Sequence, residues 1–526
     1  MPPPFQPDPK GPNGFFGLPS TWSRTLNPFE NGVLGRFEGE VADLAVFGEI
    51  PKQLDGTFYR IMIDPFYPLQ AGNPPIEGDG NICALRIRNG RVSLKTRYVD
   101  TERLRLERAA GERLFGLYRN PFSHHPCVRA AVDSTANTNL VHWAGKLLAL
   151  KESALPYAVD PDTLETLSYD PFTSPSKTFS AHPKVDPFTN ELVVFGYEAK
   201  GLGTRDIVVY ALDAAGAVRD EQWLTAPWPA FIHDCAITPN FIILVLWPYD
   251  ADVENMKAGG QHWTYNPSRP ATFIVAPRRR GGAPPPGWSP EETHRTYHWD
   301  HALLLHTAGS WEDPATGTLR FESSRMFYNV FPELGAPTDK PFGDMRADYV
   351  RWTIDPTQPD GSRVAEPEVV LGLPGEMARV DERFLTKEYD RLFCPVVVEG
   401  KECPVPPILP VGLNGYVMLE KGTGKRALFD PGFGCTIEEP VFVPRGENAA
   451  EGDGWVIGMV QRLDVSRSDL VVLDTREFER PVAVVQLPFK TKGQIHGNWV
   501  EGSRGRGLGR EYGEVKVSGR GALEQE

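Results

Sequence analysis

Short runs of hydrophobic residues, rich in β-branched and aromatic side chains, recur along the chain from about residue 56 to residue 500. Clusters of glycine, asparagine, aspartate and proline separate the runs, and this combination is typical of β-strands joined by turns. Convincing amphipathic helices are scarce. The clearest strand-like runs are residues 147–150, 192–197, 207–212, 241–247, 415–420, 455–460 and 470–473. The pattern therefore predicts an all-β protein.

Several of these runs are followed by a short polar loop and then by another run. This up-and-down rhythm is typical of propeller blades rather than of alternating strands and helices. The period is irregular, so the pattern by itself fits either a β-propeller or a large β-sandwich. The length of 526 residues leaves a single large domain possible, because big all-β architectures often run as one unit.

Composition and charge narrow the classes of partner. The formal net charge of −14 argues against nucleic acid or an anionic membrane as the main partner, since both attract a basic surface. The N-terminus lacks the pattern of a signal peptide, and the longest apolar run, residues 241–247, is too short to span a bilayer. We therefore expect a cytoplasmic protein without stable membrane insertion. The six cysteines include no C-x-x-C pair, which favours reduced, mostly buried thiols.

The common motifs of hydrolases and nucleotide-binding proteins are absent from the sequence. It contains no H-E-x-x-H and no G-x-S-x-G. The GTGK segment at residues 422–425 lacks the glycine spacing of a phosphate-binding loop, and we expect it to form a hairpin turn.

Four of the eleven histidines lie where a strand-like run meets a turn: His182, His233, His306 and His496. Their separations of 51, 73 and 190 residues match no local metal motif, and each histidine alone would be an ordinary core or turn residue. A propeller changes this, because segments from distant blades converge on its axis. Four neutral imidazoles leave the charge of a divalent ion uncompensated and leave coordination positions free. Such a set suits Fe(II) that must react with O2 better than a closed structural zinc site.

A series of short segments occurs in the same order as in one known family. They are IEGDG (76–80), ANTN (136–139), LALKE (148–152), LPY (155–157), AHPKVDP (181–187), HD (233–234), AIT (236–238) and EPVFVP (439–444). In these segments the chain resembles the carotenoid cleavage oxygenases, and among them the stilbene-cleaving branch. The resemblance implies a seven-bladed β-propeller, with loops and short helices capping the active-site face. We accordingly expect one catalytic domain over residues 35–501, an N-terminal segment (1–34) partly disordered or packed on the propeller, and a flexible C-terminal tail (502–526).

The resemblance also implies one Fe(2+) per chain, and it assigns the metal ligands and the groups that hold them. The ligands would be His182, His233, His306 and His496. Around His306 the family pattern has an asparagine where this chain has Gly309, so His298 and His301 remain alternatives for the third ligand. Ligating histidines need an acceptor on their second ring nitrogen, and by resemblance Glu152, Glu376 and Glu439 supply it. Without the resemblance, all three would be read as solvated surface glutamates.

In the stilbene-cleaving branch a tyrosine and a lysine bind the phenolic hydroxyl of the substrate, and they correspond to Tyr118 and Lys151 here. A lysine buried in a cleft is costly unless it has a partner, and a hydroxystilbene would provide one. The implied activity is cleavage of the central C=C bond of a resveratrol-like or piceatannol-like 4-hydroxystilbene by O2, which gives two aromatic aldehydes. The alternatives are double-bond cleavage of an apocarotenoid or carotenoid and, from another class, a non-catalytic propeller scaffold.

Overall fold

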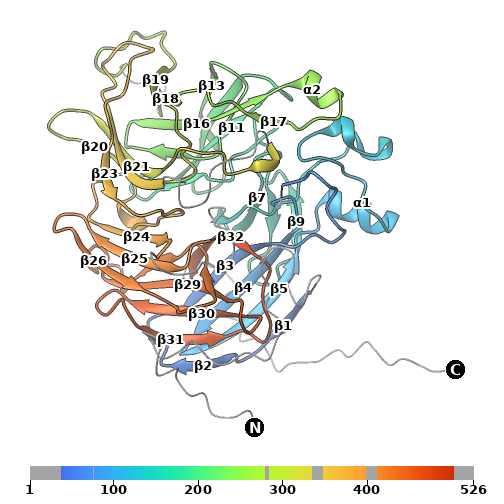
Figure 1. The fold of residues 1–526 in the computed structure, drawn as a ribbon, viewed down its shortest axis with the longest axis vertical. Helices are drawn as coiled ribbons and strands as arrows, with labels where there is room; N and C mark the ends of the chain where they lie inside the picture. The colour runs from blue at the N-terminus through green and yellow to red at the C-terminus, as the bar shows by residue number, and fades with distance from the viewer. Residues whose placement is uncertain (1–36, 75, 279–283, 335–346, 399–411, 503–526) are drawn as a thin grey trace.

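The computed structural model describes residues 37–74, 76–278, 284–334, 347–398 and 412–502 (Figure 1). The expected N-terminal segment (1–34) and all but the first residue of the expected tail (502–526) lie outside these ranges, so both stay predictions. The described strands form seven sheets arranged in a ring, which confirms the predicted seven-bladed β-propeller. We number the blades in the order in which the chain forms most of each one, beginning with the sheet that contains β3, β4 and β5.

The first three blades have the following strands. Blade 1 contains β1 (Gly39–Val41), β5 (Arg91–Tyr98), β4 (Gly80–Arg88), β3 (Gly56–Ile63) and β32 (Gln494–Glu501). Blade 2 contains β6 (Asn139–Trp143), β7 (Lys146–Leu150), β8 (Tyr157–Val159) and β9 (Thr166–Tyr169). Blade 3 contains β10 (Lys184–Asp186), β11 (Glu191–Tyr197), β12 (Asp206–Leu212) and β13 (Val218–Thr225).

The other four blades complete the ring. Blade 4 contains β14 (Ala230–Phe231), β15 (Cys235–Ile237), β16 (Phe241–Ala251), β17 (Trp263–Tyr265), β18 (Ala271–Pro277) and β19 (Arg295–Trp299). Blade 5 contains β20 (Thr307–Glu312), β21 (Leu319–Met326), β22 (Ala347–Ile354) and β23 (Glu368–Leu371). Blade 6 contains β24 (Arg391–Val396), β25 (Gly415–Glu420) and β26 (Lys425–Phe429). Blade 7 contains β2 (Ala45–Gly48), β31 (Pro481–Gln486), β30 (Arg467–Asp474), β29 (Gly454–Arg462), β27 (Cys435–Ile437) and β28 (Val441–Pro444).

Two strand pairings close the ring. The last described strand, β32, pairs antiparallel with β3 in blade 1, and β2 from the beginning of the described chain pairs antiparallel with β31 in blade 7. Blades 1 and 7 are therefore built from both ends of the chain (Figure 1). Closure matters for the site because β32 carries His496 to the axis and holds it there by its ladder with β3.

The hydrophobic core lies in layers between neighbouring blades. Leu148 and Leu150 of blade 2 pack in one cluster with Leu192 and Val194 of blade 3, and all four are completely buried. Because successive side chains of a strand point to opposite faces, a strand between two such layers is apolar on both sides. This explains the continuous apolar run at the start of β16. Burying one leucine or valine side chain of these layers stabilises the fold by about 1.5 to 3 kcal/mol.

The strand-like runs of the sequence all lie within strands, and the GTGK segment joins β25 to β26 as the expected hairpin turn. Helices are short. The two α-helices in the described ranges are α1 (Glu102–Ala110) and α2 (Val253–Lys257), which lie on one side of the ring (Figure 1). Helix α1 begins after the N-cap Thr101, whose side chain accepts a hydrogen bond from the backbone N–H of Leu104. It ends at Gly111, whose φ of 75° suits glycine.

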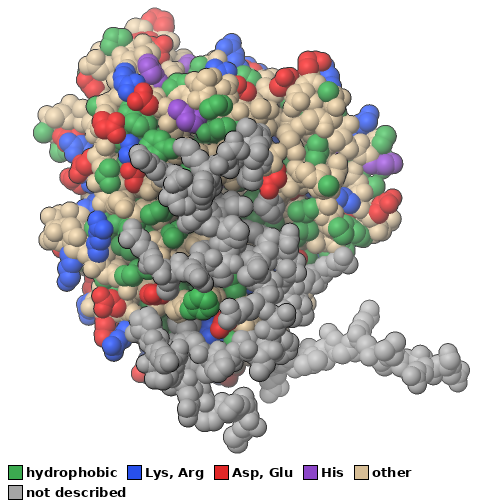
Figure 2. Space-filling view, in the orientation of Figure 1, with side chains coloured by type: hydrophobic (Ala, Val, Ile, Leu, Met, Phe, Trp, Pro, Cys, Tyr) green, Lys and Arg blue, Asp and Glu red, His purple; other side chains and the backbone are tan. Residues whose placement is uncertain are grey.

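The described cysteines agree with the expectation of reduced, mostly buried thiols. Acidic and basic side chains are interspersed over the visible part of the described surface (Figure 2). Five cysteines lie in the described ranges, and all are free thiols, four of them buried; Cys403 lies outside. Within the described ranges, no helix combines the length and hydrophobicity needed to cross a bilayer.

Candidate metal centre

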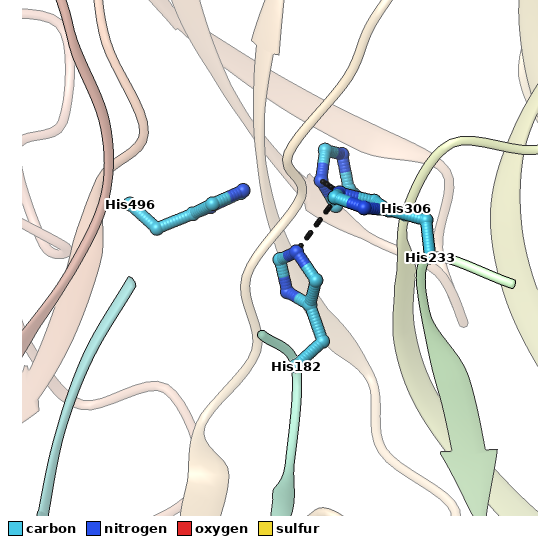
Figure 3. A group of neighbouring side chains, drawn as sticks. All are labelled: His182, His233, His306 and His496. Atoms are coloured by element: carbon cyan, nitrogen blue, oxygen red, sulfur yellow. Dashed lines mark hydrogen bonds between the residues drawn. The ribbon is translucent and has the colours of Figure 1, made fainter. Parts of the chain in front are cut away.

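The four histidines selected from the sequence meet on the propeller axis (Figure 3). His182 lies two residues before β10, His233 lies between β14 and β15, His306 directly precedes β20, and His496 lies in β32. One ring nitrogen from each lies within 4.8 Å of those of the others, and all four side chains are buried. The rings come from blades 3, 4, 5 and 1, which explains why their spacing in the sequence matches no local motif.

The ring nitrogens approach each other as metal ligands do. The Nε2 atom of His233 lies 3.0 Å from Nε2 of His182 and 3.1 Å from Nε2 of His306. The Nε2 atom of His496 is buried and has no hydrogen-bond partner in the described part of the protein. A proton on one ring could serve one of these contacts at a time, whereas a divalent cation among the four nitrogens would satisfy them together. The residues present therefore fit a metal ion.

Three buried glutamates hold the other ring nitrogen of three histidines. The Nδ1 atom of His233 lies 2.8 Å from Oε1 of Glu152. The Nδ1 atom of His306 bonds Glu376, which also accepts a hydrogen bond from the hydroxyl of Ser324. These contacts direct a proton to Nδ1 and leave Nε2 with its lone pair facing the axis, as ligation requires.

The third pair joins His496 to Glu439, with Nδ1 3.2 Å from Oε1. Glu439 also forms ion pairs with the guanidinium groups of Arg379, at 3.2 Å, and Arg60, at 3.5 Å. Two cations thus help to keep this carboxylate ionised although it is buried.

Each of the seven blades contributes one of these seven residues. Glu152 follows β7 of blade 2, and Glu439 lies between β27 and β28 of blade 7. Glu376 lies in a segment joined to β24 of blade 6 by isolated bridges on either side of it, from Gly375 to Val396 and from Arg379 to Phe393. The three glutamates can be buried because each one faces a histidine from another blade.

The electrostatics favour neutral imidazoles at His182 and His496 and an ionised carboxylate at Glu152. Burial is the main reason that the pKa of His182 lies well below its usual value, and the charges of the other three histidines lower it further. Burial is also the main reason that the pKa of His496 falls to about 4. For Glu152, burial would raise the pKa, but the charge and hydrogen bond of His233 outweigh it and lower the pKa to about 2. For His306, burial is outweighed by Glu376, which raises its pKa.

The two alternatives for the third ligand lie outside the cluster. His298 lies within β19, and His301 contacts the backbone carbonyl of Arg269 at 2.8 Å and the hydroxyl of Tyr265 at 2.6 Å. The departure at Gly309 also has a local explanation. A Cβ atom at this position would lie 2.2 Å from the ring of Tyr389, so the packing leaves no room for an asparagine.

Tyr118 and Lys151, the expected substrate-binding pair, lie together. The ammonium of Lys151 lies 4.9 Å from the centre of the Tyr118 ring and donates to Oδ1 of Asn137 at 3.2 Å. The hydroxyl of Tyr118 is buried and has no hydrogen-bond partner in the described ranges. Burial raises the pKa of Tyr118 well above its usual value and lowers that of Lys151. Lys151 directly precedes Glu152, so the pair is tied to the metal centre through the chain.

An aromatic wall beside His233 was not predicted from the sequence. The ring of Trp247 lies 4.8 Å from that of His233, Phe231 lies 4.6 Å from Trp247, and Phe231 stacks on Trp263 at 4.8 Å. Nothing in the sequence distinguishes these aromatic residues from ordinary core residues, because core aromatic residues also occur within strands. The wall makes the surroundings of His233 apolar and planar.

Comparisons with known proteins agree with this site. The family model described as retinal pigment epithelial membrane protein (RPE65) matches residues 35–501. The chain is 53% identical over 519 residues to Resveratrol cleavage oxygenase 1 of Botryotinia fuckeliana, covering 96% of this chain and 92% of that protein. It is 39% identical over 482 residues to Carotenoid cleavage oxygenase 1 of Neurospora crassa, covering 89% of each. The crystal structure of Pseudomonas brassicacearum lignostilbene dioxygenase superposes with a TM-score of 0.83 at 35% identity, covering 92% of this chain and 100% of that one. The chain therefore belongs to the RPE65 family of carotenoid oxygenases.

Proposed function

We propose that this protein is a non-haem iron(II) dioxygenase that cleaves the central C=C bond of 4-hydroxystilbenes with O2 to give two aromatic aldehydes. The observation that carries the proposal is the position of the Lys151 and Tyr118 pair, two buried polar side chains next to Glu152 of the four-histidine centre. The relative from Botryotinia fuckeliana, named for resveratrol cleavage, supports the same substrate class.

The metal would be held by His182, His233, His306 and His496. Four neutral nitrogen ligands in a buried site suit iron(II), and its three glutamates orient the rings without occupying coordination positions. Bound iron(II) would supply the activation of O2. The chain's own residues contribute a rigid cluster, because every ligand lies in a strand or within two residues of one.

The substrate would be held by its phenolic hydroxyl. The Tyr118 hydroxyl stays protonated, since burial raises its pKa, and it can donate a hydrogen bond to the phenol oxygen. The Lys151 ammonium can donate another, and a positive charge at this point favours the ionised phenolate. A phenolate is more electron-rich than a phenol and makes the conjugated double bond easier to oxidise. Trp247, whose ring lies 4.8 Å from that of His233, would offer an aromatic contact for the rest of a stilbene.

The second candidate is cleavage of an apocarotenoid or carotenoid, which the Neurospora crassa relative favours. It would use the same histidines, but it gives Lys151 and Tyr118 no polar group to bind. A non-catalytic scaffold would not require four converging imidazoles. The cytoplasmic location stays a prediction, which fractionation of the source cells would test.

Product analysis separates these candidates. The purified protein is incubated in air with resveratrol and, separately, with an apocarotenal, and the products are identified by mass spectrometry. The proposal predicts 4-hydroxybenzaldehyde and 3,5-dihydroxybenzaldehyde in equal amounts from resveratrol. Cleavage of the apocarotenal with resveratrol left intact would contradict the stilbene proposal and support the second candidate.

A further inference from the structure

A fourth buried carboxylate near the cluster, Asp234, contacts none of the four imidazole rings in the way the glutamates do. Its Oδ1 atom accepts hydrogen bonds from the ammonium of Lys184, at 2.8 Å, and from the backbone N–H of Cys235, at 2.7 Å. Its Oδ2 atom accepts from the backbone N–H of Thr307, at 2.7 Å. The Thr307 hydroxyl lies 3.0 Å from the same oxygen and 2.7 Å from the backbone carbonyl of Cys235, and its one proton serves either acceptor. Both oxygens of the carboxylate are therefore hydrogen-bonded, and none of the donors is a histidine ring.

The three segments joined by Asp234 are those that carry three of the four histidines. Asp234 directly follows His233, Thr307 directly follows His306, and Lys184 lies two residues after His182. The contacts connect the beginnings of β10, β15 and β20, the inner strands of blades 3, 4 and 5. Side chains on three separate blades are thereby tied together at one buried point.

The contacts of Asp234 restrict the movement of blades 3, 4 and 5 relative to one another. Each blade is a separate sheet, and small rotations between blades would move the histidines apart. Asp234 is 1% exposed, so its contacts are not exchanged for water, and charge-assisted hydrogen bonds in such surroundings are about twice as strong as neutral ones.

We propose that Asp234 is a positioning residue for the metal site and that its bonds to Lys184 and Thr307 hold His182, His233 and His306 at ligating distance. The inference rests on the proposed metal site. Lys184 brings a positive charge near the cluster, which by Coulomb's law disfavours a bound cation. If Lys184 acts by positioning, its removal weakens metal binding; if it acts only through its charge, removal strengthens binding.

The test measures the affinity of the metal-free full-length protein for Co2+ by competition with a chelator, using Lys184→Met, Lys184→Arg and Asp234→Asn. Loss of a group that orients metal ligands typically lowers affinity roughly 10- to 100-fold. We expect a loss in this range for Lys184→Met and Asp234→Asn, a changed Co2+ absorption spectrum in both, and recovery in Lys184→Arg. Lys184 is partly exposed, so its variants keep the test valid if Asp234→Asn does not fold.

The matched control is Asp469→Asn. Asp469 is equally buried and is ion-paired with Arg467 at 3.0 Å in blade 7, and its replacement should leave Co2+ affinity unchanged. Unchanged or tighter binding by Lys184→Met, with normal binding by the unaltered protein, would overturn the positioning role alone. If the unaltered protein does not bind Co2+, the proposed metal site itself is wrong.

Discussion

Replacing Lys151 with methionine tests whether the enzyme recognises a phenol. The change removes the ammonium and keeps most of the volume of the side chain. In the structure the ammonium is buried, and the side chain of Asn137 is its hydrogen-bond acceptor, at the long distance of 3.2 Å. It can therefore donate to a substrate oxygen without breaking a strong bond.

The magnitude follows from the burial. A hydrogen bond to a charged group contributes about 1.5 to 3 kcal/mol, and each 1.36 kcal/mol corresponds to a tenfold change in rate. We therefore expect kcat/KM for 4-hydroxystilbene to fall roughly 10- to 150-fold in Lys151→Met. For 4-methoxystilbene, which cannot ionise, the same substitution should have little effect. Tyr118→Phe removes the neighbouring hydroxyl and should show the same selectivity.

The assay compares kcat/KM for both stilbenes with the unaltered protein and each variant, after the metal content of each preparation has been measured. The ratio between the two substrates isolates the phenol contribution from any general loss of activity. A metal-replete Lys151→Met protein that keeps the original preference for 4-hydroxystilbene would refute the reasoning.

Three other substitutions test the structure around the site. Lys490 is completely buried without a hydrogen-bond partner in the described ranges, and burial lowers its pKa from 10.5 to about 8. The cost of burying its charge is fully present below pH 8 and disappears as the pH rises to 10.5. Lys490→Met should therefore raise the free energy of unfolding by about 3 kcal/mol at pH 7 and by much less at pH 10.5. Urea titrations at the two pH values test this, and an equal effect at both would contradict it. Glu198 pairs with Arg119, the residue after Tyr118, so Glu198→Gln should lower the free energy of unfolding by about 3 to 5 kcal/mol; an unchanged melting temperature would contradict this. Gly309→Ala places a methyl group against the Tyr389 ring and should cost about 1 to 3 kcal/mol in the same titration, and an equally stable variant would show that the ring can move.

The strands were predictable from the sequence because their cause is local. A strand packed between two blades must be apolar on both faces, and runs such as residues 241–247 show this directly. The closure of the ring was not predictable in this way, because it depends on pairing between β2 and β31 and between β3 and β32, which are separated by most of the chain.

The candidate site depended on more than local pattern. The four histidines stand out only once a propeller is assumed, since their convergence follows from the ring and not from spacing. Glu152 and Glu376 resemble surface residues until their histidine partners are known. Asp234 belongs to the HD segment at residues 233–234, but its partners Lys184 and Thr307 lie on other blades, so the sequence alone does not show its contacts. The aromatic wall lies in the same blade as His233, but its residues look like ordinary core residues in the sequence.

The central claim is that iron held by the four histidines makes this protein an O2-dependent stilbene-cleaving enzyme. The most direct measurement removes the metal with a chelator, restores Fe2+ stepwise, and follows aldehyde release from resveratrol in air and under argon. The account predicts no activity without metal, a rise that saturates at one Fe2+ per chain in air, and no release under argon. Aldehyde release by metal-free protein, or release that continues without O2, would contradict it.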